Sequence, residues 1–252
     1  PDNMYWFCVG DPSVLPALAA YDSDGVVVEL DFEGKPIERK EVSADVTVES
    51  VLENYLNAIG GRALVEGITD MTEVVEMSMM GMSISTETKR IPAQKAFSMT
   101  QSMGGTPVST IVLRDGKIKV SAGGMEQEIT DPAQVEAMSD IYPIPEVLGP
   151  EQGYVFTLEG IESVEGRDAY KVRQEKSGIA AYHYYDVATG LKVKSVVSAQ
   201  GQTTEAVLAD YQKTAYGILY PMTQKVTMPQ IGLVEAKVTK VEFNTGITPD
   251  QL

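Results

Sequence analysis

Turn sequences that contain glycine recur at short intervals between residues 68 and 244, and they constrain the fold more than any other feature. Five of them, at 114–117, 122–125, 164–168, 188–192 and 199–202, place glycine where a hairpin requires a positive φ. The β-rich segments lie at 68–90, 95–103, 107–114, 117–122, 153–163, 168–176, 179–187, 190–199, 202–212, 218–229 and 232–244. Consecutive hairpins form an antiparallel meander, and a sheet of about ten strands has to curl.

One clear helix precedes these strands, in TVESVLENYLNAIGG at residues 47–61. Thr47 is a suitable N-cap, and Gly60-Gly61 ends the helix. An apolar stripe at helical spacing is formed by Val48, Val51, Leu52, Tyr55, Leu56 and Ile59. Because nearly everything that follows is strand, we expect the stripe to pack against the sheet.

A proline-rich segment interrupts the strands at 131–153. It contains four prolines, and Asp131 can cap a helix whose first residue is Pro132. We expect one or two short helices here, near the open face of the sheet. The predicted fold is therefore mainly β (α+β): a curled antiparallel sheet, or half-open β-barrel, wrapped around helices.

Residues 1–45 have a different pattern, that of a small α/β segment. Apolar runs predict strands at 4–9 and 26–30, and Asp11 with Pro12 predicts a helix between them. Such a unit cannot bury both of its faces alone. We therefore expect two parts, a segment 1–45 that needs further sheet and a β domain 46–252.

Charge and cysteine content exclude several classes of protein. The net charge of −16 would repel a phosphate backbone or an anionic lipid surface, so no nucleic-acid partner is expected. The single cysteine, Cys8, excludes an internal disulfide. No stretch reaches the ~18 apolar residues of a transmembrane helix.

Residues with catalytic or metal-binding potential are few. His183 lies between tyrosines in a predicted strand, which is typical of a structural histidine. Cys8 lies in an apolar run, which predicts an inert core thiol. The sequence lacks a G-x-S-x-G elbow, the spacing of a calcium loop and a G-x-G-x-x-G fingerprint. It therefore predicts no catalytic residue, no metal site and no cofactor.

Methionines gather in MTEVVEMSMMGM, residues 71–82, which contains five of the twelve in the chain. If 72–88 is one strand, both of its faces are apolar at the middle. Methionine packs irregular cores, but it also lines binding sites that adapt to different ligands. The methionines could therefore belong to a packed core or to the wall of a binding cavity, and the sequence leaves both interpretations open. The candidates for the lining of an apolar cavity are Met77, Met79, Met80, Met82, Phe97, Met99 and Met103.

The first 37 residues, PDNMYWFCVGDPSVLPALAAYDSDGVVVELDFEGKPI, resemble the closing strand, helix and strand of an insulinase-like (pitrilysin) zinc metallopeptidase domain. In that family an H-x-x-E-H helix holds the zinc ion. His183 is the single histidine here, so this chain cannot form that site. The resemblance implies that any zinc-peptidase residues lie upstream in the same polypeptide.

The remainder is similar to the outer-membrane lipoprotein carrier family of Gram-negative bacteria. The segment VLENYLNAIGGRALVEGITDM, at 51–71, resembles the opening motif of lipoprotein-sorting relatives common in Bacteroidetes. GRDAYKV at 166–172 and YYDVATGLKVK at 184–194 resemble their hairpins. The resemblance implies a periplasmic protein whose incomplete β-barrel wraps around helices and encloses an apolar cavity.

Two hypotheses follow for function. The first is a non-catalytic periplasmic module that binds a lipid, or an acylated peptide or lipoprotein, in the concavity of the sheet. It would be attached to an upstream peptidase region, with a signal peptide further upstream, and the full-length parent would be an insulinase-family zinc metallopeptidase. The alternative is a docking or scaffold module of such a peptidase, with a filled core and no ligand.

Overall fold

The computed structural model describes residues 40–79, 81–139, 141–199, 202–228 and 232–252, together with Cys8, 15–21, 25, 27, 28, 30 and 34. The chain forms two units, Pro1–Arg39 and Lys40–Leu252. Each unit is described by itself.

The described part of the first unit contains the short helix α1 (Leu15–Leu18) and the 3-10 turn η2 (Ala19–Tyr21). The predicted helix cap at Asp11, the strand at 4–9 apart from Cys8 and much of the strand at 26–30 lie outside the described residues. Cys8 is exposed, so the prediction of a core thiol is wrong. Among the described residues of this unit, Cys8, Ala17, Tyr21, Val28 and Leu30 are exposed.

The second unit begins with the predicted helix, which is confirmed as α2 (Val48–Ile59). The Thr47 hydroxyl accepts a hydrogen bond from the Ser50 N–H at 3.2 Å, and the Ser50 hydroxyl accepts one from the Thr47 N–H at 3.0 Å. These two bonds satisfy donors that a helix N-terminus leaves free. Gly60, at φ 133°, ends α2 in a backbone conformation that favours glycine, and α3 (Arg62–Glu66) follows.

The described strands form one thirteen-stranded antiparallel sheet. They are β1 (Met71–Met79), β2 (Met82–Ile91), β3 (Ala96–Met103), β4 (Thr106–Arg114), β5 (Lys117–Ala122), β6 (Met125–Ile129), β7 (Val155–Val164), β8 (Arg167–Lys176), β9 (Ile179–Asp186), β10 (Lys192–Ala199), β11 (Gln202–Lys213), β12 (Leu219–Met228) and β13 (Gly232–Phe243).

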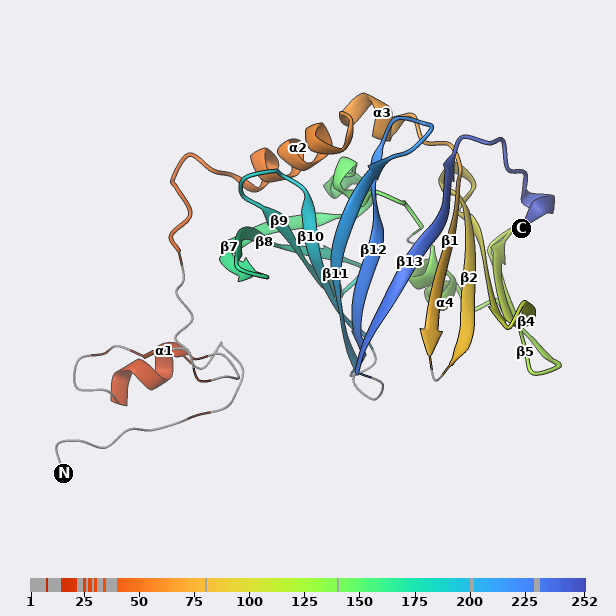
Figure 1. Cartoon of the computed structure of the whole chain (residues 1–252), viewed down its shortest axis with the longest axis horizontal. Coiled ribbons are helices and arrows are strands. Elements are labelled where there is room, and N and C mark those ends of the chain that lie inside the picture. Colours follow the sequence, from red (N-terminus) through yellow and green to blue (C-terminus); the bar gives the residue numbers. More distant parts are fainter. Residues whose placement is uncertain are drawn as a thin grey trace. The chain divides into compact units, whose positions relative to one another are not determined.

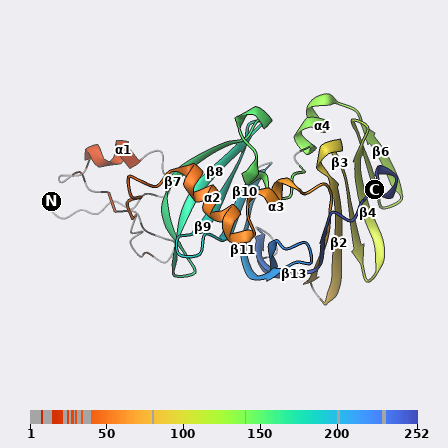
Figure 2. The same cartoon turned by 90° about the horizontal axis from the view of Figure 1, so that it is seen from above.

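Their order is β6-β5-β4-β3-β2-β1-β13-β12-β11-β10-β9-β8-β7, so the first and last strands pair at the middle of the sheet. The sheet curls around α2 and α3, which cross one end of it, with β7–β10 on one side and β2–β6 on the other (Figures 1 and 2). We call the face that packs against these helices the inner face and the opposite face the outer face. The predicted fold class is confirmed.

Two predicted strand assignments need correction. The segment 68–90 is not one strand but the hairpin β1–β2, with Gly81 at φ 78° in its turn. The sequence here is apolar on both sides of a single glycine, so the turn gives a weak signal. Strand β6 was not predicted, because MEQEI is polar and exposed and lacks the apolar alternation of a half-buried strand.

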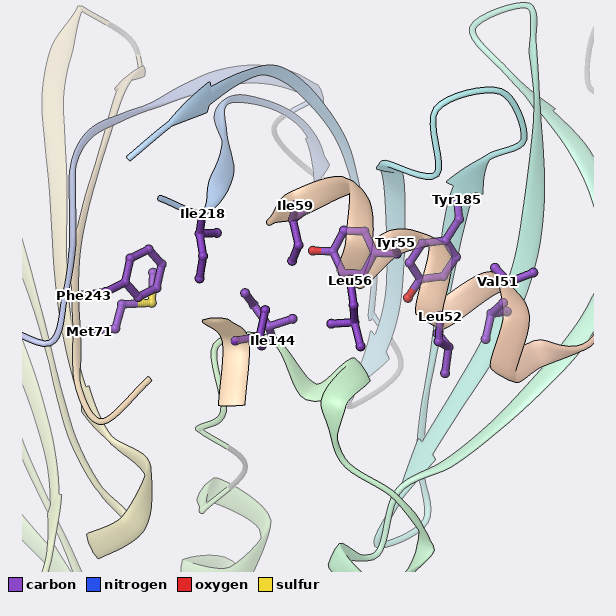
Figure 3. Close-up of a cluster of buried hydrophobic side chains, with 12 residues drawn as sticks. Val51, Leu52, Tyr55, Leu56, Ile59, Met71, Ile144, Tyr185, Ile218 and Phe243 are labelled. Carbon is purple, nitrogen blue, oxygen red and sulfur yellow. The ribbon is translucent and has the colours of Figure 1, made fainter. Parts of the chain in front are cut away.

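The main core lies between α2 and the inner face. Leu56 and Ile59 are fully buried there, and Tyr55 packs against Tyr185 with ring centroids 5.3 Å apart (Figure 3). The buried members of this core are Val51, Leu52, Tyr55, Leu56, Ile59, Val65, Met71, Ile144, Val172, Tyr185, Ile218 and Phe243. The predicted packing of the helix stripe on the sheet is therefore confirmed.

The segment 131–153 also packs on the inner face. It forms α4 (Pro132–Met138), η4 (Pro145–Val147) and η5 (Pro150–Gln152), and the Asp131 carboxylate caps α4 by accepting from the Gln134 N–H. Ile144 enters the main core, while Ile141 packs with Phe97, Leu113 and Ile118 in a second one. The remaining 3-10 turns are η3 (Pro92–Gln94) and η6 (Pro249–Gln251).

Candidate ligand-binding face

Three of the candidate methionines lie on the inner face at the β1–β2 hairpin. Met71 is fully buried in the main core, and Met77 and Met79 lie at even spacing from it along the same strand. Met79 pairs with Met82 in β2. Because directly paired residues share a face of the sheet, Met82 also lies on the inner face. Met80 lies outside the described residues.

The hairpin changes how these side chains are grouped. In a single strand over 72–88, Met82 would lie on the opposite face from Met77 and Met79. The turn around Gly81 reverses the chain and brings all three to one face. The three methionines, which a single strand would divide between two faces, therefore lie together on the inner face.

Strand β3 adds the other three candidates to this face. Phe97 pairs with Arg90, Met99 with Thr88, and Met103 with Ile84. Arg90, Thr88 and Ile84 are themselves paired with inner-face positions of β1. Six of the seven candidates thus share the inner face.

Their exposure differs. Phe97 is buried against Leu113 and Ile141 and belongs to the second core. Met82 is 46% exposed and Met99 is 37% exposed.

Met77, Met79 and Met103 are half-buried. The candidate face is therefore packed in a core at Phe97, and its methionines near the β1–β2 hairpin are partly accessible to solvent.

The other side of the curled sheet also carries accessible apolar residues on its inner face. Tyr185 of β9 is fully buried in the main core, and Ile179 lies at even spacing from it in the same strand. Val197 of β10 pairs with Ala181 of β9, again at even spacing. Ile179 is 47% and Val197 39% exposed.

The helices cover the inner face unevenly. Met71, at the start of β1, and Phe243, at the end of β13, pack in the main core with α2. Figure 1 shows the β1–β2 hairpin at the far end of the sheet from α2 and α3. One end of the inner face is therefore filled by helices, and the other end carries methionine side chains that remain partly accessible.

A buried ion pair lies within the main core. The Glu146 carboxylate, in η4, pairs with the Lys192 ammonium and accepts a hydrogen bond from the Tyr185 hydroxyl at 2.8 Å. Burial alone would raise the pKa of Glu146, but the nearby Lys192 charge and hydrogen bond hold it below its ordinary value. Burial, then the Glu146 charge, raise the pKa of Tyr185 well above its ordinary range. The pair fixes the loop 141–147 on the sheet.

His183 lies beside this pair on the same face, and its Nδ1 is 2.9 Å from the Ser195 hydroxyl. Burial and then the Lys192 charge lower the pKa of His183 to about 3. A histidine with so low a pKa is a poor general base at neutral pH. Among the described residues, no carboxylate bonds its buried Nε2 to orient the ring, so this Ser–His contact lacks the arrangement of a catalytic triad.

Sequence reasoning did not identify Glu146 or Lys192. Glu146 lies in a proline-rich loop and Lys192 directly after a turn, and both positions ordinarily indicate exposed charges. Their pairing joins residues 46 positions apart in the chain. Nothing in local spacing could have signalled it.

Two hollows lie elsewhere on the second unit. One, of about 350 Å³, lies between α2 and the turn 186–190, beside Asn54, Asn57 and Thr189. The other, of about 530 Å³, lies between 42–49 and 156–160. Neither is lined by any of the seven candidate residues.

Among the described residues, no three His, Cys, Asp or Glu side chains come together in a way that could hold a metal ion. In the same part of the chain, no helix is long and apolar enough to cross a membrane.

Solved structures resemble the chain, although no family model and no curated protein sequence matches it. A LolA-superfamily protein from Nitrosomonas europaea has a TM-score of 0.54 at 10% identity, covering 82% of this chain and 96% of that one. A domain described as an outer-membrane lipoprotein-sorting protein, from Vibrio parahaemolyticus, has a TM-score of 0.52 at 14% identity, covering 79% of this chain and 94% of that one. These likenesses show the fold. The chain has the curled, mostly β fold of LolA-superfamily and lipoprotein-sorting-like domains, as the sequence resemblance implied.

Proposed function

We propose that residues 46–252 form a non-catalytic module that binds an apolar ligand, either a lipid or an acylated peptide or lipoprotein, on the inner face of the sheet. The likeness to lipoprotein-sorting-like folds supports this proposal and a periplasmic location. We further propose that residues 1–45 are the end of an insulinase-like peptidase domain of the same polypeptide, in a Bacteroidetes-type parent with a signal peptide upstream. The sequence resemblance of residues 1–37 supports that parentage.

One observation carries the binding proposal: apolar side chains remain partly exposed on both sides of the inner face. The exposed portions of Met82 and Met99 together amount to nearly one whole side chain. Fully burying one methionine is worth about 1.5–3 kcal/mol. Ile179 and Val197 add a comparable exposed area on the other side. An acyl chain that covered these residues would gain this free energy in addition to about 0.8 kcal/mol for each of its own methylene groups that it buries.

The residue type fits this role. Methionine has three rotatable bonds and a polarisable sulfur, so a methionine-lined face adapts to chains of different length and shape. The half-buried Met77, Met79 and Met103 extend the face along β1 and β3.

The test uses an uncharged fluorescent acyl ester and a pair of matched variants. Met99→Glu puts a charge on the inner face. Val155→Glu puts the same charge at a 50% exposed position of β7 that lies on the outer face, because its neighbour Phe156 packs against the main core. We expect saturable probe binding by the parent and by Val155→Glu, and at least about a tenfold loss in Met99→Glu, because a buried charge without a partner is costly. Equal binding by the two variants would place the ligand elsewhere and refute the proposal.

The packed end of the inner face favours a second candidate, a docking or scaffold module with a filled interior. There, α2, α3 and the loop 141–147 occupy the sheet surface, with Leu56 and Ile59 fully buried. A parent protein that shows no saturable acyl binding would support this candidate. The same result would exclude the carrier-like function.

A further inference from the structure

Four methionines occupy neighbouring positions on the inner face at the β1–β2 hairpin. Met79 is directly opposite Met82, and Met77 is two residues from Met79 on the same strand. Met103 is directly opposite Ile84, two residues from Met82 along β2. Directly opposed residues in a sheet have Cβ atoms about 4.5–5.5 Å apart, and diagonal neighbours about 7–8 Å. Met77, Met79 and Met82 are therefore neighbours of one another, whereas Met103 lies two strands, about 9–10 Å, from Met77 and Met79.

Packing does not account for this choice of residue. Strands favour β-branched and aromatic residues, and methionine has no special preference for them. Met82 is 46% exposed and the other three are half-buried, so none of them fills a closed core. An adaptable apolar surface uses the flexibility of the methionine side chain. The thioether sulfur adds a metal-ligand atom that such a surface does not require.

Thioether sulfur is a soft ligand, and soft ligands select Cu(I) among the biologically common metal ions. Each methionine side chain has three rotatable bonds, so sulfurs from direct and diagonal neighbours in a sheet can turn toward a single point. The buried Ile84 lies between Met77 and Met103, and it would shield one side of that point from water. The net charge of −16 favours the approach of a cation.

We propose that Met77, Met79 and Met82 form a binding site for one Cu(I) ion, with Met82 as the central ligand. This inference goes beyond acyl binding and does not depend on it. The two differ in what they require of the same side chains: an apolar ligand needs their volume and apolar surface, whereas Cu(I) needs their sulfur.

The test is an anaerobic titration of the full chain with Cu(I), in competition with a chromophoric Cu(I) chelator. The titration uses a Cys8→Ser background, because the exposed Cys8 thiol is itself a ligand for Cu(I). We expect one equivalent to bind. Met82→Leu should weaken binding by at least about tenfold, since the loss of even an outer-shell partner costs 10–100-fold in metal affinity.

Met125→Leu is the matched control. Met125 is 76% exposed on the edge strand β6, away from the three proposed ligands, and its variant should bind Cu(I) like the parent. Met-to-Leu exchange nearly conserves volume, so both variants should fold. Circular dichroism and urea denaturation check this, and we expect both variants to match the parent. Loss of Cu(I) binding in a Met82→Leu variant that folds like the parent separates the sulfur atom from the volume of the side chain.

A second measurement identifies the ligand atoms. Thioethers carry no proton at accessible pH, whereas thiolate and imidazole ligands must lose one to bind a metal. We therefore expect the Cu(I) affinity, corrected for the chelator, to stay flat between pH 8 and pH 5, and X-ray absorption to show sulfur ligands alone. The proposal is overturned if Met82→Leu binds Cu(I) as the parent does, if no equivalent binds, or if nitrogen and oxygen dominate the coordination.

Discussion

Replacing Lys192 with Met should make the stability of the protein depend on pH in a way that isolates the Glu146 carboxylate. Glu146 is 2% exposed, and its Oε1 receives both the Lys192 ammonium and the Tyr185 hydroxyl. Lys192→Met retains much of the aliphatic volume and removes the charge. Both the reference protein and the variant carry His183→Leu, because His183 lies beside Glu146 and the loss of Lys192 would let the imidazole supply a charge in its place. The carboxylate would then be buried with one neutral hydrogen bond and no counter-charge.

Without Lys192, the buried Glu146 carboxylate can avoid carrying an unpaired charge by taking up a proton. The free energy of that protonation sets the expected loss in stability. A glutamate has an ordinary pKa of 4.5. Holding it protonated costs about 1.36 kcal/mol per pH unit above that value, or about 3.4 kcal/mol at pH 7 and about 0.7 kcal/mol at pH 5. We therefore expect the variant to lose about 3 kcal/mol at pH 7, in line with the 3–5 kcal/mol typical of a broken buried pair, and less than about 1 kcal/mol at pH 5.

The sign of the pH dependence comes from the direction of each pKa. In the parent, the folded-state pKa of Glu146 is lowered, so its contribution is complete above pH 4.5 and is lost as the pH falls through the folded value. Glu146 therefore adds no pH dependence to the parent between pH 7 and pH 5. In the variant, burial without Lys192 raises the folded-state pKa. Acidification then protonates the folded state and reduces the cost of the substitution.

Urea denaturation of the reference protein and of the Lys192→Met variant at pH 7 and pH 5 measures this difference. The combination of Glu146→Gln with Lys192→Met, in the same His183→Leu background, is the control, because the introduced side-chain amide can still accept from Tyr185 and carries no charge. It should recover to within about 1 kcal/mol of the reference protein at pH 7. A cost for Lys192→Met that is equal at both pH values would show that lost packing, and not a stranded carboxylate, causes the destabilisation.

Three further predictions concern other parts of the fold. His183 has a folded-state pKa of about 3 against an ordinary value of 6.5, so the parent should lose stability as the pH falls from 6.5 toward 3. His183→Leu should make the free energy of unfolding, measured by urea denaturation, depend less on pH in that range. An unchanged slope would mean that His183 is protonated in the folded state. Phe97→Ala should lower the free energy of unfolding by about 3–5 kcal/mol because Phe97 is buried, whereas Met82→Ala should lower it by less than about 1 kcal/mol because Met82 is 46% exposed. Similar losses for the two variants in chemical denaturation would contradict this difference. Residues 46–252 alone should unfold as cooperatively as the whole chain, since α2 and the sheet share one core, and a molten 46–252 would disprove that boundary.

The sequence predicted what is encoded locally. The α2 stripe, its Thr47 cap and the glycine turns at 114–117, 122–125, 164–168 and 188–192 each specify a backbone conformation within a few residues, and the structure has them where they were expected. The central residues of the fifth predicted turn, at 199–202, lie outside the described residues. The hairpin around Gly81 was missed because apolar methionines stand where polar turn residues usually do. As a result, Met82 was assigned to the wrong face relative to Met77 and Met79.

Other features depend on contacts between distant parts of the chain. The pair of Glu146 and Lys192 forms only when the loop 141–147 folds onto β9 and β10, and no local pattern indicates that a charge in such a loop will be buried. The pairing of β1 with β13 has the same character, because it joins the two ends of the β domain. Periodicity predicts which residues can pair but leaves open which strands do so.

The stability of the fold and the proposed ligand binding depend on different ends of one sheet. At the end covered by α2, the side chains of Met71 and Phe243 are buried, and truncating either should cost several kcal/mol. At the hairpin end, Met82 and Met99 have up to nearly half of their surface exposed, so changing them removes little packing. The continuous backbone ladder from β1 to β3 holds those methionines in register whatever their side chains contact. Substitutions at the hairpin end, such as Met82→Leu, should therefore alter the proposed binding without a large loss in folding free energy.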